Sequence, residues 1–137
     1  MRKCIIVLYS NKDIESISAR AKMIHHLRSS ILEEGVEVKK EKHTREVCQI
    51  DFTDGHTIMA FQVGHHLHGL RASHLFLCKE IFKLENGSEY IENVCLSRVV
   101  NKEMYGGIDE RDRVFTFELQ NGELNVDFYQ KDVDESK

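Results

Sequence analysis

The chain has 137 residues, of which 41% are hydrophobic and 31% charged, and its formal net charge is −4. This length predicts one domain over residues 1–137, and the composition excludes a largely disordered protein, with only the acidic stretch 131–137 expected to be disordered. The balance of charge is far from that of a dedicated nucleic-acid binder, although residues 1–45 hold ten Lys or Arg against six Asp or Glu, and residues 103–137 hold four against ten.

The cysteines and the N-terminus indicate the compartment. The four cysteines lie far apart with no CxxC pair, which predicts reduced, mostly buried thiols in a reducing compartment; they are Cys4, Cys48, Cys78 and Cys95. The apolar run after the charged N-terminus is too short for a signal peptide, and no stretch approaches the roughly 20 apolar residues of a membrane span. We therefore expect a cytoplasmic protein with no membrane contact.

The first two elements are a strand and a helix. Residues 4–10, "CIIVLYS", form a continuous apolar run of β-formers, which predicts a strand buried on both faces of a parallel sheet. A helix over 13–34 follows, with Ser10 or Asn11 as its cap and Gly35 as its stop. Its predicted apolar stripe comprises Ile14, Ile17, Ala21, Ile24, Leu27 or Arg28, and Ile31.

An antiparallel hairpin and a second buried strand complete the first half. After an alternating segment at 36–43, two β-forming runs flank the Asp54-Gly55 turn, which is a strong hairpin signal. Residues 74–78, "HLFLC", predict a short strand. We expect this strand to be the parallel neighbour of 4–10, with the helix on one face and the hairpin extending the sheet.

The second half begins with a helical stripe and ends with another hairpin. Ile91, Val94, Cys95 and Val99 recur at helical spacing before a break at Gly106-Gly107. The Asn121-Gly122 turn then predicts three apolar cross-strand pairs on one face: Leu119 with Leu124, Phe117 with Val126, and Phe115 with Phe128.

The stretch 64–80, "GHHLHGLRASHLFLCKE", holds four of the eight histidines. One interpretation is a contact surface, in which His65, His66, His68 and Arg71 project from the carboxyl-end side of the sheet, where α/β folds bind ligands. The alternative is a zinc site of His65, His68, His74 and Cys78, because zinc takes His and Cys ligands. Their spacing fits no established zinc signature, so we expect no metal and no cofactor.

A basic patch lies at "KKEKHTR" and comprises Lys39, Lys40, Lys42 and Arg45. Contact with nucleic-acid phosphates is one interpretation. A solvated turn at a hairpin end is favoured, because no aromatic residues are interleaved for base stacking.

Residues 3–81 resemble the P-loop ATPase core of phage large terminase subunits. Ile50, Phe52 and Gly55 match the hairpin signature of that family, and a second set matches its loop and Walker B strand: Gly69, Leu70, Arg71, Ala72 and His74. The resemblance implies an α/β fold with a partial P-loop ATPase-like sheet and antiparallel β-hairpin additions.

Two departures argue against catalysis. The sequence contains no GxxxxGK[ST] motif to cradle phosphates, and Cys78 or Lys79 replaces the Asp that holds Mg²⁺ in the family, while Glu80 lies near the position of its catalytic Glu. The resemblance therefore implies a non-catalytic, virus-encoded module in the host cytoplasm. It would bind a protein partner or DNA through the contact surface and Glu80, with a homo-oligomer possible.

Two alternatives stay open. One is a metal-dependent hydrolase or nuclease that uses the His65–His74 cluster. The other is one half of a split DNA-packaging ATPase, in which a second chain supplies the phosphate loop and this chain supplies Arg71 and Glu80.

Overall fold

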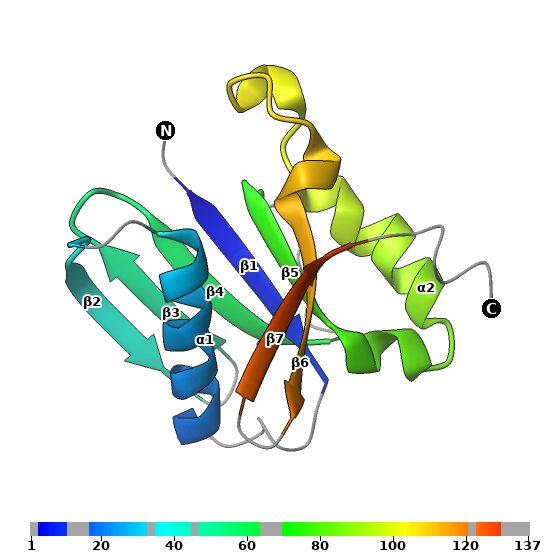
Figure 1. Ribbon diagram of the computed structural model, residues 1–137, viewed down its shortest axis with the longest axis horizontal. Coiled ribbons are helices and arrows are strands. Elements are labelled where there is room, and N and C mark those ends of the chain that lie inside the picture. The colour runs from blue at the N-terminus through cyan, green and yellow to red at the C-terminus, as the bar shows by residue number, and fades with distance from the viewer. Residues whose placement is uncertain are drawn as a thin grey trace.

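The computed structural model describes residues 3–10, 17–32, 35–44, 47–63, 70–120 and 123–129. A seven-stranded mixed sheet forms its centre, in the order β2-β3-β4-β1-β5-β6-β7 (Figure 1). The strands are β1 (Cys4–Tyr9), β2 (Val38–His43), β3 (Val47–Phe52), β4 (Thr57–Gln62), β5 (His74–Cys78), β6 (Val114–Gln120) and β7 (Glu123–Phe128). The helical segments are α1 (Ile17–Ile31), η2 (Lys79–Lys83), α2 (Gly87–Tyr90), η3 (Ile91–Cys95), η4 (Leu96–Arg98), η5 (Lys102–Met104) and η6 (Glu110–Arg113).

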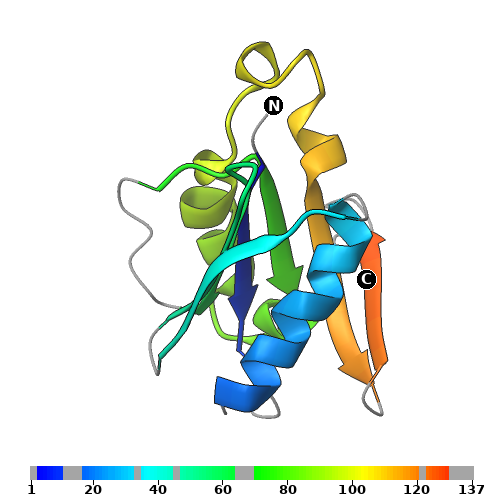
Figure 2. The ribbon, with the colours of Figure 1, turned by 90° about the vertical axis from the view of Figure 1, so that its left-hand side faces the viewer.

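The four central strands run parallel. β1 pairs with β4 on one side and β5 on the other, and β5 pairs with β6. Residues Ile5 to Tyr9 of β1 are at most 2% exposed, as the apolar run predicts for a strand covered on both faces. Helix α1 lies on one face and the helical run 79–98 on the other (Figure 2). The prediction that β1 and β5 are parallel neighbours is confirmed.

Helix α1 buries a stripe that differs in part from the predicted one. Met23, Ile24 and Leu27 are buried, whereas Ala21 is only half-buried. The additional buried residue is Arg20, which is 1% exposed. The two terminal nitrogens of its guanidinium donate hydrogen bonds to the Tyr9 hydroxyl (2.6 Å) and the Thr44 carbonyl (3.0 Å), so both find partners inside the fold.

The hairpin of β3 and β4 extends the sheet as predicted. The Gly55 N–H bonds to the Phe52 carbonyl at 3.0 Å, and Gly55 has a φ of 93°, which glycine adopts without strain. Burial alternates along β3, because one of its faces packs on the core. β2 then pairs with β3 and forms one edge of the sheet.

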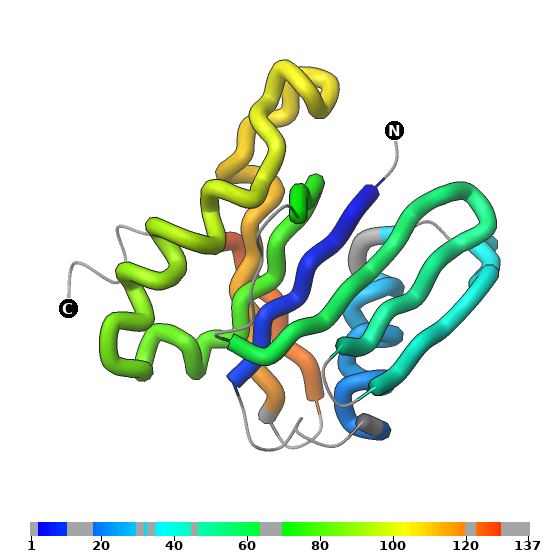
Figure 3. Tube along the Cα trace, turned by 180° about the vertical axis from the view of Figure 1, so that it is seen from behind, coloured from blue at the N-terminus to red at the C-terminus, as the bar shows by residue number. Residues whose placement is uncertain are grey.

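The second helical region is an irregular run rather than one helix. Segments η2, α2, η3 and η4 follow one another over 79–98, with 3₁₀, α and π turns in succession. Figure 3 shows the winding path of this green to yellow-green part of the chain. A Cβ on Gly87 would lie 2.0 Å from the Ile81 carbonyl oxygen, so only glycine fits there. Of the predicted stripe, Ile91, Cys95 and Val99 are buried.

The hairpin of β6 and β7 has the predicted register. Leu119 pairs with Leu124, Phe117 with Val126, and Phe115 with Phe128. Phe117 is fully buried, but Phe128 on the edge strand is 56% exposed, so the apolar face is covered only in part. The turn residues 121–122 and the acidic stretch 131–137 lie outside the described residues.

All four cysteines are free, and Cys48, Cys78 and Cys95 are buried. Burial raises the pKa of Cys95 to about 12, which makes that thiol unreactive. None of the helices in the described part of the chain is long and apolar enough to cross a lipid bilayer.

Candidate functional site

Arg71 and His74 lie at the amino end of β5. Ser73 ties this end to the start of β1, because its Oγ accepts from the Cys4 N–H at 2.8 Å and its own N–H donates to the Cys4 carbonyl at 2.8 Å. The expected position of Arg71, on the carboxyl-end side of the sheet, is therefore wrong. The physical reason is that β4 and β5 are both parallel to β1, so the intervening chain returns to the amino ends before β5 begins.

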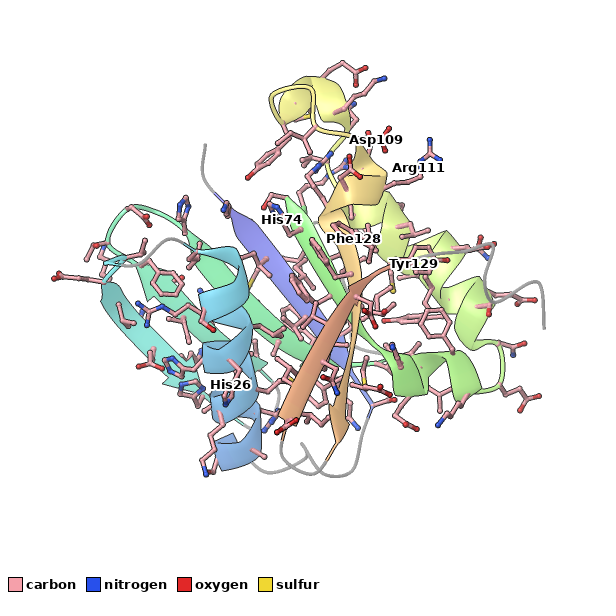
Figure 4. The ribbon with its side chains drawn as sticks, in the orientation of Figure 1. His26, His74, Asp109, Arg111, Phe128 and Tyr129 are labelled. Atoms are coloured by element: carbon pink, nitrogen blue, oxygen red, sulfur yellow. The ribbon has the colours of Figure 1, made fainter. Side chains whose placement is uncertain are left out.

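His74, labelled in Figure 4 at the end of β5, contacts two aromatic rings. The Tyr105 ring meets it edge-on at 5.5 Å, the Phe115 ring stacks at 6.4 Å, and the Ser73 hydroxyl lies 2.9 Å from its Nδ1. Burial, together with the weaker effect of the positive charges of Lys3 and Arg113, lowers the pKa of His74 to about 4. His74 is therefore neutral near pH 7 and serves the packing of this end of the sheet.

Arg113, the last residue of η6, closes the same end of the sheet. Its side chain is 1% exposed, and its guanidinium donates to three backbone carbonyls: Ile108 (3.2 Å), Ser73 (2.9 Å) and Val100 (2.6 Å). It also stacks over the Tyr105 ring at 5.0 Å. Backbone carbonyls rather than a carboxylate thus stabilise this buried charge. We call the four buried or half-buried residues that contact one another here the closed network: Ser73, His74, Tyr105 and Arg113.

The alternative zinc set is wrong as a set. His74 and Cys78 are the first and last residues of β5, and four steps of a strand separate them by about 13 Å. Zinc binds its ligands at roughly 2.0–2.3 Å, so the two side chains cannot share one ion. The remaining loop histidines, His65, His66 and His68, lie outside the described residues.

The carboxyl end of β5 carries a paired ammonium group. Cys78 is buried, and the Lys79 Nζ lies 3.0 Å from an Asp127 carboxylate oxygen and 3.9 Å from one of Glu118. Glu80 is partly exposed and pairs with Lys83 at 3.3 Å. A cation thus lies at one of the two positions where the resemblance expects a magnesium ligand.

The described residues of the basic patch lie along an edge strand. Lys39, Lys40 and Lys42 are exposed on β2, while Arg45 lies outside the described residues. The pKa of Asp51 is lowered by hydrogen bonds from Gln49 and Thr57, and then by the charges of Lys40 and Lys39. The patch is therefore partly neutralised, and its charges protect the edge from pairing with another strand.

A cluster that the sequence did not reveal lies beside α1. His25 of α1 and His43 of β2 point their Nε2 atoms at the same Glu41 oxygen, at 2.7 Å and 3.0 Å. The hydrogen bond with His43, and then that with His25, lowers the pKa of Glu41. Glu41 and His43 are two residues apart and so share a strand face, but nothing in the sequence relates them to His25.

These three residues are the one group in the described part of the chain whose metal-ligating atoms all lie within 4.8 Å of one another. We call His25, Glu41 and His43 the open cluster, because their side chains are 39%, 34% and 21% exposed. Among the described residues, the open cluster is the arrangement that could hold a metal ion.

Comparison with known proteins adds no family and no relative. No family model, no curated protein and no solved structure matches the chain. The functional interpretation consequently depends on the geometry of these sites and on the resemblance of residues 3–81.

Proposed function

We propose that the protein is a non-catalytic module, related to the terminase ATPase core, that acts by binding a protein partner. The arrangement of β4, β1 and β5 is the observation that carries the proposal. These strands are parallel neighbours, α1 follows β1, and the β3-β4 hairpin precedes β5, which is the chain order that the resemblance implies. The module would be virus-encoded, as are the proteins that it resembles.

The carboxyl end of β5 supports a role without catalysis. A magnesium site needs carboxylate or hydroxyl oxygens, and the family Asp is replaced by buried Cys78 or by Lys79. The ammonium group of Lys79 already pairs with Asp127 and Glu118, so it neutralises the acidic groups nearest to this strand end. Glu80 alone cannot organise phosphoryl transfer without phosphate anchors.

The surface charge favours a protein partner over DNA. Glu41 interrupts the lysines of β2, and Lys39 and Lys40 lie close enough to Asp51 to lower its pKa. Arg71 is exposed, and within the described residues its side chain makes no ion pair or hydrogen bond with another residue. A guanidinium in that state is suited to a carboxylate on a partner, because Arg forms bidentate pairs. We propose Arg71, at the amino end of β5, as the centre of the contact surface.

Affinity capture with the tagged full chain from expressing or infected cells, with and without nuclease, tests this function. We expect a protein partner that survives nuclease treatment and is bound about tenfold more weakly by Arg71→Ala, the effect of losing one charge-assisted hydrogen bond. Arg111→Ala, which removes another exposed arginine, is the matched control and should bind normally. Capture of nucleic acid alone would favour the DNA interpretation.

Calorimetry with ATP and Mg²⁺ tests the non-catalytic part. We expect no binding, because the sequence lacks the phosphate cradle that supplies most of the affinity. Micromolar affinity, or a turnover that Glu80→Gln abolishes, would overturn the proposal.

A further inference from the structure

The open cluster brings two imidazoles and one carboxylate together from two separate elements. His25 comes from α1, and Glu41 and His43 come from β2. We propose that these three side chains form a binding site for a divalent transition metal ion, with Zn²⁺ as the ion that the ligand set fits. The site is independent of the partner-binding role, because none of its residues is a matched position of the resemblance or part of the contact surface.

The distances are close to those that zinc requires. In a tetrahedral site with bonds of about 2.0–2.1 Å, neighbouring ligand atoms lie roughly 3.3 Å apart. The two imidazole Nε2 atoms lie 2.7 Å and 3.0 Å from the Glu41 oxygen, and all three ligand atoms lie within 4.8 Å of one another. Small side-chain rotations would therefore open the cluster around an ion without any change in the backbone.

The chemistry of the ligands selects the ion. Two histidines and a glutamate are a ligand set of zinc sites that keep one position open for water, whereas Ca²⁺ and Mg²⁺ prefer oxygen ligands alone. The partial exposure of the three side chains gives an ion a path from solvent. His25 also borders a shallow hollow of about 390 Å³, whose other lining residues are Ser18, Ala21, Lys22, His26 and Ser29. Water or a small ligand has room beside the site.

The surroundings of His43 set the expected affinity. Its Nδ1 atom is buried and has no hydrogen-bond partner in the described residues. In zinc sites, a hydrogen bond to the ring nitrogen that does not bind the metal orients the imidazole. Losing that hydrogen bond typically costs about 10–100-fold in metal affinity. We therefore expect a dissociation constant on the order of micromolar rather than nanomolar for this three-ligand site.

Calorimetric titration of the untagged, metal-stripped full chain with ZnCl₂ tests the proposal. We expect one Zn²⁺ per chain and a loss of affinity of about 100-fold or more in His25→Ala and in Glu41→Gln, each of which removes a ligand. His26→Ala is the matched control, because it removes an exposed histidine from the next position of α1, outside the cluster. Its affinity should equal that of the wild type.

A second readout separates loss of a ligand from loss of fold. Circular dichroism should give the same metal-free spectrum for all variants, and visible absorption of bound Co²⁺ should report nitrogen and oxygen ligands in the wild type and in His26→Ala. Failure of the wild type to bind Zn²⁺ at millimolar concentration would overturn the proposal. So would unchanged binding by the double variant His25→Ala, Glu41→Gln, since the ion would then be held elsewhere, for example by His65, His66 and His68.

Discussion

The closed network and the open cluster both contain histidine, but they treat it in opposite ways. His74 lies between the rings of Tyr105 and Phe115 near two positive charges, and its pKa falls to about 4. His25 and His43 remain partly exposed and face one carboxylate, that of Glu41. The same side chain is therefore an uncharged packing residue at one site and a donor to an anion at the other.

The difference shows how neighbours decide what a histidine can bind. A cation that approached His74 would meet the charges of Lys3 and Arg113 and would lack an anionic ligand in the described residues. A cation that approached the open cluster would gain a carboxylate and two imidazoles. Substitutions at both sites, changes of pH and added zinc test this contrast.

The largest effect should come from Arg113→Met. The substitution keeps an apolar stem but leaves the buried carbonyls of Ile108, Ser73 and Val100 without their donor. We expect the free energy of unfolding to fall by about 3–5 kcal/mol in urea denaturation. Arg111→Met, two residues away and 90% exposed, should change it by less than about 0.5 kcal/mol. A loss below about 1 kcal/mol for Arg113→Met would mean that these carbonyls do not depend on Arg113 for their hydrogen bonds.

Acid should destabilise the protein through His74. Its folded pKa of about 4 lies below the ordinary value of 6.5, so the unfolded state binds more protons between these two pH values. The contribution of His74 to the free energy of unfolding is fully present above pH 6.5 and is lost as the pH falls through that window. His74→Phe should remove this part of the pH dependence, measured by denaturation at several pH values. An identical pH profile in the variant would show that His74 titrates normally.

Zinc should raise the stability of the wild type through the open cluster. At a free Zn²⁺ concentration of 100 times the dissociation constant, the gain should be about 2.7 kcal/mol, seen as a higher melting temperature. Glu41→Gln should show little of this gain, and His26→Ala should show all of it. Equal gains in all three proteins would place the stabilising ion outside the cluster.

Without metal, Glu41→Gln should have the smallest effect. Partly exposed ion pairs contribute about 0–1 kcal/mol, and Glu41 is 34% exposed. We expect a change in the free energy of unfolding within that range in the presence of a chelator. A loss above 2 kcal/mol would show that the cluster holds α1 on the sheet and is a structural feature of the metal-free fold.

Local patterns in the sequence predicted much of the sheet. The Asp54-Gly55 turn and the register of Phe117 with Val126 depend on periodicity and turn chemistry within short windows. The adjacency of β1 and β5 was predicted from the general rules that govern layers and connections in α/β folds. The helical run 79–98 was less predictable, because its mixed turns reflect close contacts such as that of Gly87 with Ile81.

The sites depend on contacts between distant parts of the chain, and for that reason the sequence did not reveal them. From the sequence, Arg20 and Arg113 would be expected on the surface, because arginine is usually exposed. Both are buried, and each donates to a backbone carbonyl that is remote in sequence: Thr44 for Arg20 and Ser73 for Arg113. The open cluster likewise joins residues 16 positions apart. The many histidines in 64–80 suggested a metal site in a different part of the chain, but His74 and Cys78 are too far apart to bind one ion.

Nuclear magnetic resonance of the histidine rings during a zinc titration distinguishes the two sites in one experiment, because it reads each imidazole separately. We expect the ring signals of His25 and His43 to change together as Zn²⁺ approaches one equivalent, while the ring of His74 is unaffected. Changes at His65, His66, His68 or His74, with His25 and His43 unmoved, would contradict this expectation.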